Sequence, residues 1–444
     1  MSTPRTPLVT SGLPADELAA RTRRWVEEQV PEAWRVAALR GGAAAIRQVR
    51  SRDDYEAWYP TFAATGLVAP TWPVVYGGAG LTPAEARVVE AELAPYNLGR
   101  LNPLGLSLAA PALFAFGTEE QRLRFLPPIV RNDEVWCQLF SEPGAGSDLA
   151  SLATRAERDG DTWTVTGQKV WNTWAHLADF GVLLARTDTE VPKRQGITYF
   201  LVDMRSAGVE VRPLRHLTGE VDFNEVFLDQ VQVPDSQRVG EVGAGWKVAN
   251  ATLSGERQMV SGSGSGGVDR IGGSGPDRLV RLAQQISAEG RPGGWDDPLV
   301  RQRLMQVVSE DRIRAWTNQR VRATVRAGRA PGPESSIGKV HQGGLNQRIQ
   351  ALATELLGAG SMAWPGRTMA WPDGATSTAE EADVGERYAA SLPYEVRGML
   401  RSLANTIEGG TTEVNKNIIA ERVLGLPREP DPWQGAPWRD VPRN

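Results

Sequence analysis

Apolar residues recur at helical spacing in the first third of the chain. Leu18, Trp25 and Val26 fall on one helical face between charged residues. Two later segments, 82–85 and 118–121, each begin with a Thr that is followed three positions on by Glu or Gln. This spacing is typical of a capping box, in which side chains satisfy the free backbone N–H groups of a helix start. The pattern therefore predicts an N-terminal region of helices.

The middle of the chain has a different residue pattern. Short runs of β-branched and aromatic residues alternate with turn residues such as those at 158–161. Such runs predict strands of an antiparallel sandwich or barrel. The predicted strands cover residues 162–167, 181–185, 196–202, 209–212 and 226–233.

Helical spacing returns after residue 245, with Val300, Leu304, Val307 and Val308 on one face. The order helix, strand, helix without βαβ alternation argues against a doubly wound sheet. Two segments, 261–275 and 363–386, interrupt the helical pattern and are predicted to be loops or inserts. The first contains a glycine pattern of the dinucleotide-binding type, but it follows a helical stretch instead of a strand, so a flexible or close-packed backbone is the better interpretation.

Composition narrows the class of protein. The 444 residues are 41% hydrophobic and carry a net charge of −4, which gives no general attraction to nucleic acid or to acidic lipid. A single cysteine, Cys137, excludes a disulfide framework, and three distant histidines give no metal-ligand spacing. The first twelve residues lack the apolar core of a signal peptide, and no stretch is long and apolar enough to span a bilayer. We therefore expect a cytoplasmic protein with no bound metal and no membrane or nucleic-acid partner.

Two motifs carry the most specific signal. Residues 136–148 read Trp-Cys-Gln-Leu-Phe-Ser-Glu-Pro-Gly-Ala-Gly-Ser-Asp, in which Pro and Gly residues indicate an unusual backbone path between two serines. Residues 167–173 read Gly-Gln-Lys-Val-Trp-Asn-Thr. On composition alone each motif would be a turn or a strand.

Together the two motifs resemble the acyl-CoA dehydrogenase family. Further segments match the family in the same order, and the resemblance extends from about Phe62 to Arg428. These segments are 223–228, 231–234, 245–246 and 417–427.

The resemblance implies an α+β fold in three parts. An N-terminal helical domain would span residues 1–135, a central antiparallel β-barrel-like domain residues 136–240, and a C-terminal four-helix bundle with a Gly-rich insert residues 241–444. It also implies FAD bound between the β domain and the bundle, with part of the site supplied by a neighbouring subunit. The implied reaction is α,β-desaturation of an acyl-CoA thioester, in an oligomer that passes electrons to an electron-transfer flavoprotein or a similar acceptor.

The same resemblance assigns residues to the cofactor site. By the family pattern Trp171 would pack on the flavin ring, Thr173 would lie near its N5, and Ser147 would approach the pyrophosphate. The full set of FAD-binding residues implied is Gln138, Phe140, Ser141, Gly146, Ser147, Trp171, Asn172, Thr173, Thr411 and Glu413.

The catalytic base is harder to assign from the sequence. In much of the family the base is a Glu before Gly-Thr near the C-terminus, but alignment on Gly410 and Thr411 places Gly409 there, with Glu408 one residue early. A minority of the family carries the base on a bundle helix as Glu followed by Arg. Glu256 and Arg257 match that pattern at the expected distance from 245–246. Glu256 is therefore the predicted base, with Glu408 as the alternative, and Arg257 and the backbone of Gly409 as predicted substrate contacts.

The chain also departs from the family pattern. The Arg-x-x-Phe-Gly motif is not recognisable near 278–293, and the Gln-x-x-Gly-Gly motif has Glu355 in place of Gln, a charge that is unfavourable unless it is paired. The chain would thus either bind FAD in an altered way as a homo-oligomer or form a hetero-oligomer with a partner that supplies the missing contacts. Some relatives that act on steroid side chains form such unlike pairs and share the Glu-Arg placement. Two other functions stay open: a flavin oxidase, such as a nitroalkane oxidase, and a non-catalytic partner subunit.

Overall fold

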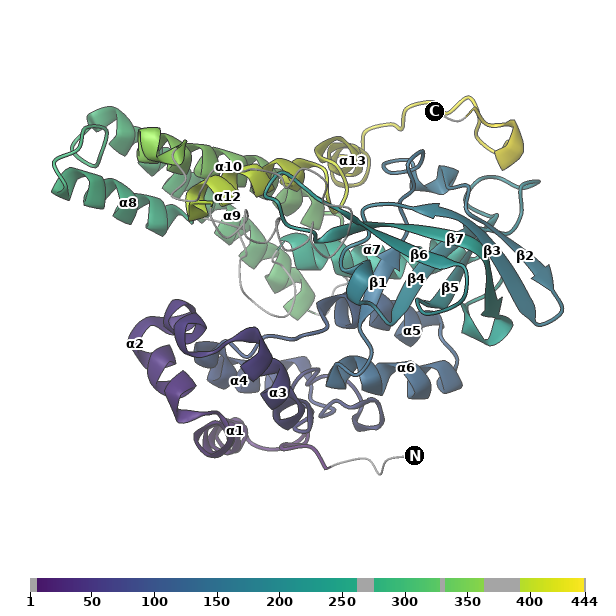
Figure 1. The fold of residues 1–444 in the computed structure, drawn as a ribbon, viewed down its shortest axis with the longest axis horizontal. Coiled ribbons are helices and arrows are strands. Elements are labelled where there is room, and N and C mark those ends of the chain that lie inside the picture. Colours follow the sequence, from purple (N-terminus) through teal and green to yellow (C-terminus); the bar gives the residue numbers. More distant parts are fainter. Residues whose placement is uncertain (1–5, 262–274, 328–331, 363–391, 443–444) are drawn as a thin grey trace, which may run out of the picture.

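The computed structural model describes residues 6–261, 275–327, 332–362 and 392–442, with only the backbone at residues 43, 44, 47, 254–261, 325 and 326. The Gly-rich dinucleotide-like pattern and all of the predicted insert at 363–386 lie outside the described residues. N-terminal helices form the lower part of the molecule, a β domain lies at one side, and C-terminal helices lie above (Figure 1). The predicted α+β class is confirmed.

The N-terminal part is built from helices that enclose their own apolar core. The predicted capping boxes are present: Thr82 and Glu85 begin one helix, and Thr118 and Gln121 begin another. A π-helical segment, Gly105–Ala109, precedes the fifth α-helix. The helices are α1 (Ala15–Gln29), α2 (Glu32–Val49), α3 (Arg52–Ala63), α4 (Pro83–Leu93), α5 (Ala110–Phe116) and α6 (Glu119–Arg131).

The β domain is one eight-stranded sheet in the order β6-β7-β3-β2-β4-β5-β8, with β1 paired to β4. Most pairs are antiparallel, as predicted, but β1 runs parallel to β4. The strands are β1 (Trp136–Leu139), β2 (Arg155–Asp159), β3 (Thr162–Lys169), β4 (Phe180–Arg186), β5 (Ile197–Asp203), β6 (Val209–Leu214), β7 (Phe223–Pro234) and β8 (Arg238–Val239). Strands β4 and β5 are buried along almost their whole length because both faces of the sheet are covered there.

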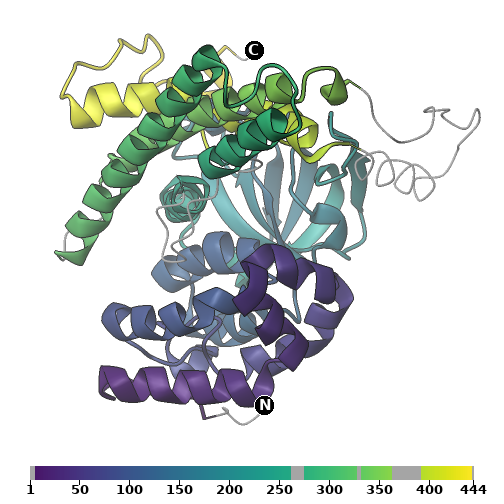
Figure 2. The same ribbon diagram turned by 90° about the vertical axis from the view of Figure 1, so that its left-hand side faces the viewer.

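The C-terminal part is again helical and has its own core, to which Leu304 and Val307 contribute as the periodicity predicts. A long green helix, α9, crosses this part in the view of Figure 2. The helices are α7 (Gly245–Ser261), α8 (Pro276–Ala288), α9 (Pro298–Arg326), α10 (Ser335–Leu357), α12 (Tyr394–Ser402) and α13 (Thr412–Ile418). None of the helices in the described ranges is both long and apolar enough to cross a lipid bilayer.

Helix α7 joins the three parts. The hydroxyl of Thr252 is buried, lies 3.0 Å from the Tyr199 hydroxyl on β5, and donates to the Leu108 carbonyl of the π-helical segment at 3.1 Å. Gly245 starts the helix against β5, where a Cβ would lie 2.6 Å from the Thr198 backbone. Glycine is therefore required at this close approach.

Replacement of Thr252 by Val should lower the free energy of unfolding by about 1–3 kcal/mol, because it leaves the buried Leu108 carbonyl and Tyr199 hydroxyl without this partner. Urea unfolding measures the change. Thr317→Val is the matched control, since that hydroxyl donates to the Ile313 carbonyl of its own helix at an exposed site, and it should change stability by less than about 0.5 kcal/mol. Equal effects of the two substitutions would contradict this role of Thr252.

Candidate functional site

The two sequence motifs meet where β1 and β3 end. The Val170 amide donates to the Ser141 carbonyl at 3.0 Å, and the Asn172 side chain donates to the Gln138 carbonyl at 2.7 Å. Gly167 allows β3 to approach the residue before β2, because a Cβ there would lie 2.3 Å from the Thr154 hydroxyl oxygen. The structure thus brings together segments that lie thirty residues apart in the sequence.

Trp171 projects from this junction. Its side chain is 62% exposed, although its backbone has a left-handed φ of 62°, which is uncommon for a bulky residue. The strain is held by neighbours, since the Asn172 amide donates to the Asn224 carbonyl and the Asn224 side chain donates to the Asn172 carbonyl. Phe223 packs against the Trp171 ring edge-to-face at 6.0 Å. A large aromatic face kept exposed by a fixed backbone indicates a surface for a flat ligand.

The other predicted residues of this junction differ in exposure. The Phe140 ring is buried against Tyr199 in the core, so its side chain does not line an open face. Ser141 and Thr173 are half-buried, and Gly146 and Ser147 are exposed on the turn that follows β1. The Asn172 Oδ1 atom is buried and has no hydrogen-bond partner among the described residues.

A buried ion pair lies directly beneath the turn. The Lys169 ammonium bonds to the Glu142 carboxylate at 2.7 Å and to the carbonyls of Phe140 and Leu184 at 3.1 and 2.8 Å. The Glu142 carboxylate also accepts the Ala153 and Thr154 amides.

Burial lowers the pKa of Lys169. Burial alone would raise the pKa of Glu142, but the Lys169 charge and the hydrogen bonds outweigh it and hold that pKa below its ordinary value. The sequence reasoning missed this pair, although a Lys inside an apolar strand was a signal for it.

The C-terminal candidates lie on a separate element. Gly409 and Gly410 both have left-handed backbone, with φ of 64° and 85°, which favours glycine. Thr411 caps α13 by accepting the Val414 amide, and Glu413 is exposed in the first turn of that helix. In the described part of the chain, no hydrogen bond or ion pair joins Thr411 or Glu413 to the two β-strand motifs.

Glu408, the alternative base, is engaged in an ion pair. Its carboxylate accepts from Arg401 at 2.8 and 3.3 Å and from the Asn405 side chain at 2.8 Å. The Arg401 guanidinium also lies 5.8 Å from the Phe223 ring, which in turn touches Trp171. Arg401 therefore donates to both oxygens of this carboxylate, which leaves neither oxygen free of a donor.

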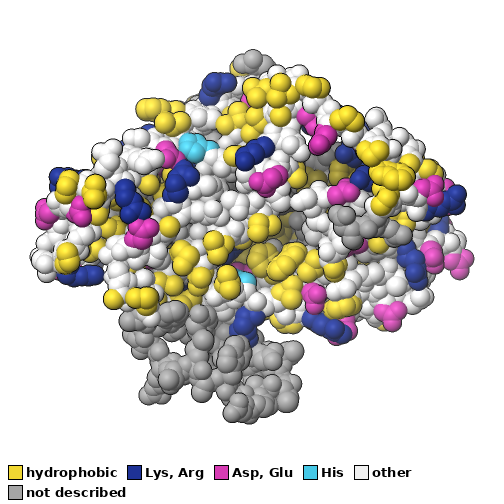
Figure 3. Space-filling model, turned by 90° about the horizontal axis from the view of Figure 1, so that it is seen from above, with side chains coloured by type: hydrophobic (Ala, Val, Ile, Leu, Met, Phe, Trp, Pro, Cys, Tyr) yellow, Lys and Arg dark blue, Asp and Glu magenta, His cyan; other side chains and the backbone are white. Residues whose placement is uncertain are grey.

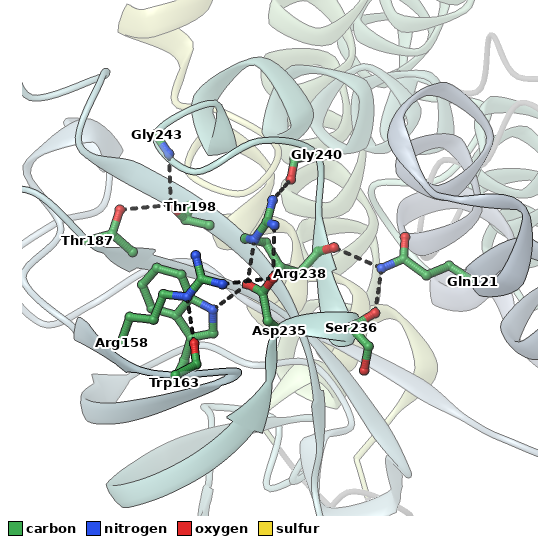
Figure 4. A network of polar contacts seen from close by, with 11 residues as sticks. Gln121, Arg158, Trp163, Thr187, Thr198, Asp235, Ser236, Arg238, Gly240 and Gly243 are labelled. Atoms are coloured by element: carbon green, nitrogen blue, oxygen red, sulfur yellow. Dashed lines mark hydrogen bonds and ion pairs between the residues drawn. The ribbon is translucent and has the colours of Figure 1, made fainter.

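Glu256 and Arg257 lie in the second half of α7, where only the backbone is described. The start of this helix is fixed by a network of polar contacts shown in Figure 4. The Thr198 hydroxyl accepts the Gly243 amide at 3.0 Å, and Asp235 binds Arg238 just before the turn into α7. Gln121 of α6 donates to the Ser236 and Arg238 carbonyls, both at 2.8 Å.

Asp235 is the charged centre of that network. Hydrogen bonds from Arg238 and Trp163 lower its pKa to about 2, so the carboxylate stays ionised at neutral pH. The backbone that carries position 256 therefore starts from a point tied to the N-terminal helices and to the sheet.

The structure shows what surrounds the residues that depart from the family pattern. Glu355 forms an ion pair with Arg303 at 2.5 Å, so the charge that replaces Gln is compensated. Arg278 pairs with Glu395 and lies 4.4 Å from the Tyr394 ring. Arg303 and Glu395, the partners in these two pairs, were outside the sequence prediction, because each ion pair joins two different helices.

Seen from above, yellow hydrophobic side chains gather around a hollow near the centre of the face (Figure 3). Charged side chains lie mostly nearer its outline. Such a distribution fits a ligand or subunit contact on this side of the molecule.

Three family models match the chain. They are described as the N-terminal, middle and C-terminal domains of acyl-CoA dehydrogenase and match residues 15–133, 137–231 and 243–424. Acyl-CoA dehydrogenase IpdE1 of Mycobacterium tuberculosis is 38% identical over 93% of this chain and 98% of its own length. Acyl-CoA dehydrogenase FadE34 of the same organism is 39% identical over 87% of this chain, which spans about half (48%) of that relative.

Solved structures agree with these matches. One titled "Tcur3481-Tcur3483 steroid ACAD" superposes with a TM-score of 0.66 at 28% identity, over 94% of this chain and 98% of that one. The ChsE4-ChsE5 complex from Mycobacterium tuberculosis superposes with a TM-score of 0.64 at 27% identity, over 94% and 99% of the two chains.

Proposed function

We propose, from the premise that this chain belongs to the acyl-CoA dehydrogenase family, that Glu256 is the base with which it desaturates a bulky, steroid-derived acyl-CoA thioester. Family membership makes the chain an FAD-dependent oxidoreductase that acts on CH–CH bonds. The observation that carries the choice of base is the ion pair of Glu408 with Arg401, which engages both oxygens of the alternative carboxylate and so favours the Glu-Arg position on α7.

The β-domain junction fits a flavin. Trp171 offers an exposed aromatic face, and the buried Asn172 Oδ1 atom beside it offers an acceptor without a partner in the described residues. Gln138, Ser141 and Thr173 would supply polar contacts around the ring, and the exposed turn with Gly146 and Ser147 would meet the pyrophosphate. Bound FAD supplies the acceptor for the hydride that leaves the β-carbon.

The residues of this chain would provide the proton chemistry. The Glu256 carboxylate would remove the α-proton, while Arg257 would contact the substrate. The Gly409 amide, in a loop whose left-handed backbone is suited to glycine, would donate to the thioester oxygen as charge develops on it. A dry pocket would raise the proton affinity of Glu256 toward neutral pH and so make it an effective base.

The proposed substrate class follows from the relatives. The solved structure at 28% identity is titled a steroid ACAD and covers almost all of this chain. Gly and Ser residues follow Glu256 in the sequence and carry little side-chain bulk. Both observations favour a wide acyl group over a straight short chain.

Anaerobic titration tests this proposal. The purified protein, loaded with FAD, should lose its yellow flavin absorption with a steroid side-chain CoA thioester and much less with butyryl-CoA. A straight-chain preference would contradict the substrate class. Bleaching by no thioester, from a chain that holds FAD, would contradict dehydrogenation by this chain.

Two further measurements separate the alternatives. Rapid reoxidation of the reduced flavin by oxygen would indicate an oxidase. Slow reoxidation by oxygen, together with faster reoxidation by an added electron-transfer flavoprotein, supports the dehydrogenase. One FAD per protomer in the chain purified alone supports a homo-oligomer, and FAD binding only with a second chain supports a hetero-oligomer.

A further inference from the structure

A buried arginine holds the backbone that follows the cofactor turn. Arg186, at the end of β4, is almost fully buried and donates to the Ala150 carbonyl at 2.7 Å and to the Leu152 carbonyl at 3.2 Å. It also donates to the Lys193 carbonyl at 2.6 Å in the β4–β5 loop. These bonds bind one rigid guanidinium fork to the segment just after Ser147.

The β4–β5 loop makes a second contact with the turn that carries Ser147. The Lys193 ammonium lies 2.7 Å from the Asp148 carboxylate, which also accepts the Ser151 hydroxyl at 2.6 Å. Asp148 directly follows Ser147. The position of Ser147 therefore depends on the β4–β5 loop and on Arg186.

The C-terminal chain closes over this arrangement. After α13 the chain, drawn in yellow, runs back toward the β domain and ends there in a short 3₁₀ turn, Trp438–Asp440 (Figure 1). The Trp438 ring is buried and lies 4.6 Å from the Arg186 guanidinium. The Trp438 amide donates to the Val191 carbonyl at 2.9 Å, and Arg439 pairs with Glu190 at 2.5 Å, so the turn is bound to the β4–β5 loop at several points.

We propose that residues 437–440, called here the C-terminal strap, position the FAD-binding turn through Arg186. This inference rests on the proposed function, because it takes the turn at Ser147 as the pyrophosphate site. Trp438 shields the guanidinium from water, and a shielded cation binds both an aromatic face and carbonyl groups more strongly than an exposed one. Trp438 and Arg186 are thus positioning residues, which act on the cofactor site through the turn.

Substitution of Trp438 tests the strap on the FAD-loaded enzyme. Trp438→Ala should raise the dissociation constant for FAD about tenfold, which corresponds to about 1.4 kcal/mol. Trp438→Phe keeps an aromatic face and should restore affinity to within about twofold. Trp433→Ala is the matched control, because Trp433 is 45% exposed in the same C-terminal chain and should leave affinity unchanged.

Hydrogen exchange separates positioning from general destabilisation. In the FAD-saturated enzyme, the amides of residues 148–154 should exchange at least about tenfold faster in Trp438→Ala than in the wild type, while those of α10 keep their wild-type rates. If Trp438→Ala does not fold, Trp438→Leu replaces it, since Leu fills part of the volume without an aromatic face. Unchanged exchange at 148–154, or an equal loss of affinity in Trp433→Ala, would overturn the proposal.

The outcomes distinguish this inference from the proposed function. A wild-type chain that binds FAD but is reduced by no thioester refutes the proposed reaction. The exchange and affinity measurements then still test whether the strap positions the FAD-binding turn. A reducible enzyme whose FAD affinity is indifferent to Trp438 refutes the strap alone.

Discussion

Glu256→Gln should retain FAD and lose flavin reduction by its acyl-CoA substrate. The amide has nearly the shape of the carboxylate but cannot take the α-proton, and a positioned general base typically contributes about 10²- to 10⁴-fold in rate. We therefore expect the rate of anaerobic flavin bleaching to fall by about that factor, measured by stopped-flow absorption. Exchange of the substrate's α-hydrogens with deuterated water should fall equally, because that exchange requires the base but no hydride transfer.

Glu408→Gln is the matched control, since Glu408 is the other candidate. Its carboxylate pairs with Arg401 and Asn405, so under the proposed assignment its replacement removes an ion pair and keeps the base. We expect reduction to stay within about tenfold of the wild type. The reverse result, with Glu408→Gln inactive and Glu256→Gln active, would move the base to the C-terminal loop.

The architecture could be predicted because the helix-capping signals, the hydrophobic periodicity and the order of elements all indicate the same arrangement of helices and strands. The capping boxes at Thr82 and Thr118 and the alternation in the strands are local signals, and local structure follows from them directly. The two motifs at the ends of β1 and β3 were identified by their order in the chain, and the structure shows that they meet.

The contacts that hold the site were not predictable in this way. Arg303 and Glu355 lie far apart in the sequence, as do Trp438 and Arg186, and no periodicity links them. Ion pairs and cation–π contacts between distant segments depend on how helices and loops pack, which a single sequence does not encode locally. Phe140 illustrates the same limit, because its ring packs in the core against Tyr199 of β5, a contact between distant segments that the motif itself does not encode.

Lys169→Met should lower the free energy of unfolding by about 3–5 kcal/mol, because it leaves the Glu142 carboxylate buried without its counter-charge. Met nearly matches the length of Lys, so the effect reports the lost charge more than a cavity. The turn that carries Ser147 follows Glu142 directly, and we therefore expect weaker FAD binding as well. Urea unfolding at pH 7, with and without added FAD, measures both consequences.

The pH dependence identifies the cause. In the wild type the lowered pKa of Glu142 gives a stabilisation that is complete above its unfolded value near 4.5 and is lost as the pH falls through the folded value. In Lys169→Met burial acts without the ammonium and raises the pKa of Glu142, so protonation stabilises the variant instead. The stability gap between the two proteins should therefore begin to narrow above pH 4.5, as the variant takes up its proton, and continue to narrow as the pH falls through the lowered pKa of Glu142 in the wild type.

A double substitution completes the test of the pair. Adding Glu142→Gln to Lys169→Met removes the unpaired charge and keeps one carbonyl oxygen, which can accept one of the Ala153 and Thr154 amides that bind the two carboxylate oxygens of Glu142. The double variant should be more stable than Lys169→Met alone, with a coupling of at least about 1 kcal/mol between the two sites. Additive losses and a pH-independent gap would instead mean that Lys169 stabilises the turn through its bonds to the Phe140 and Leu184 carbonyls and not through its charge.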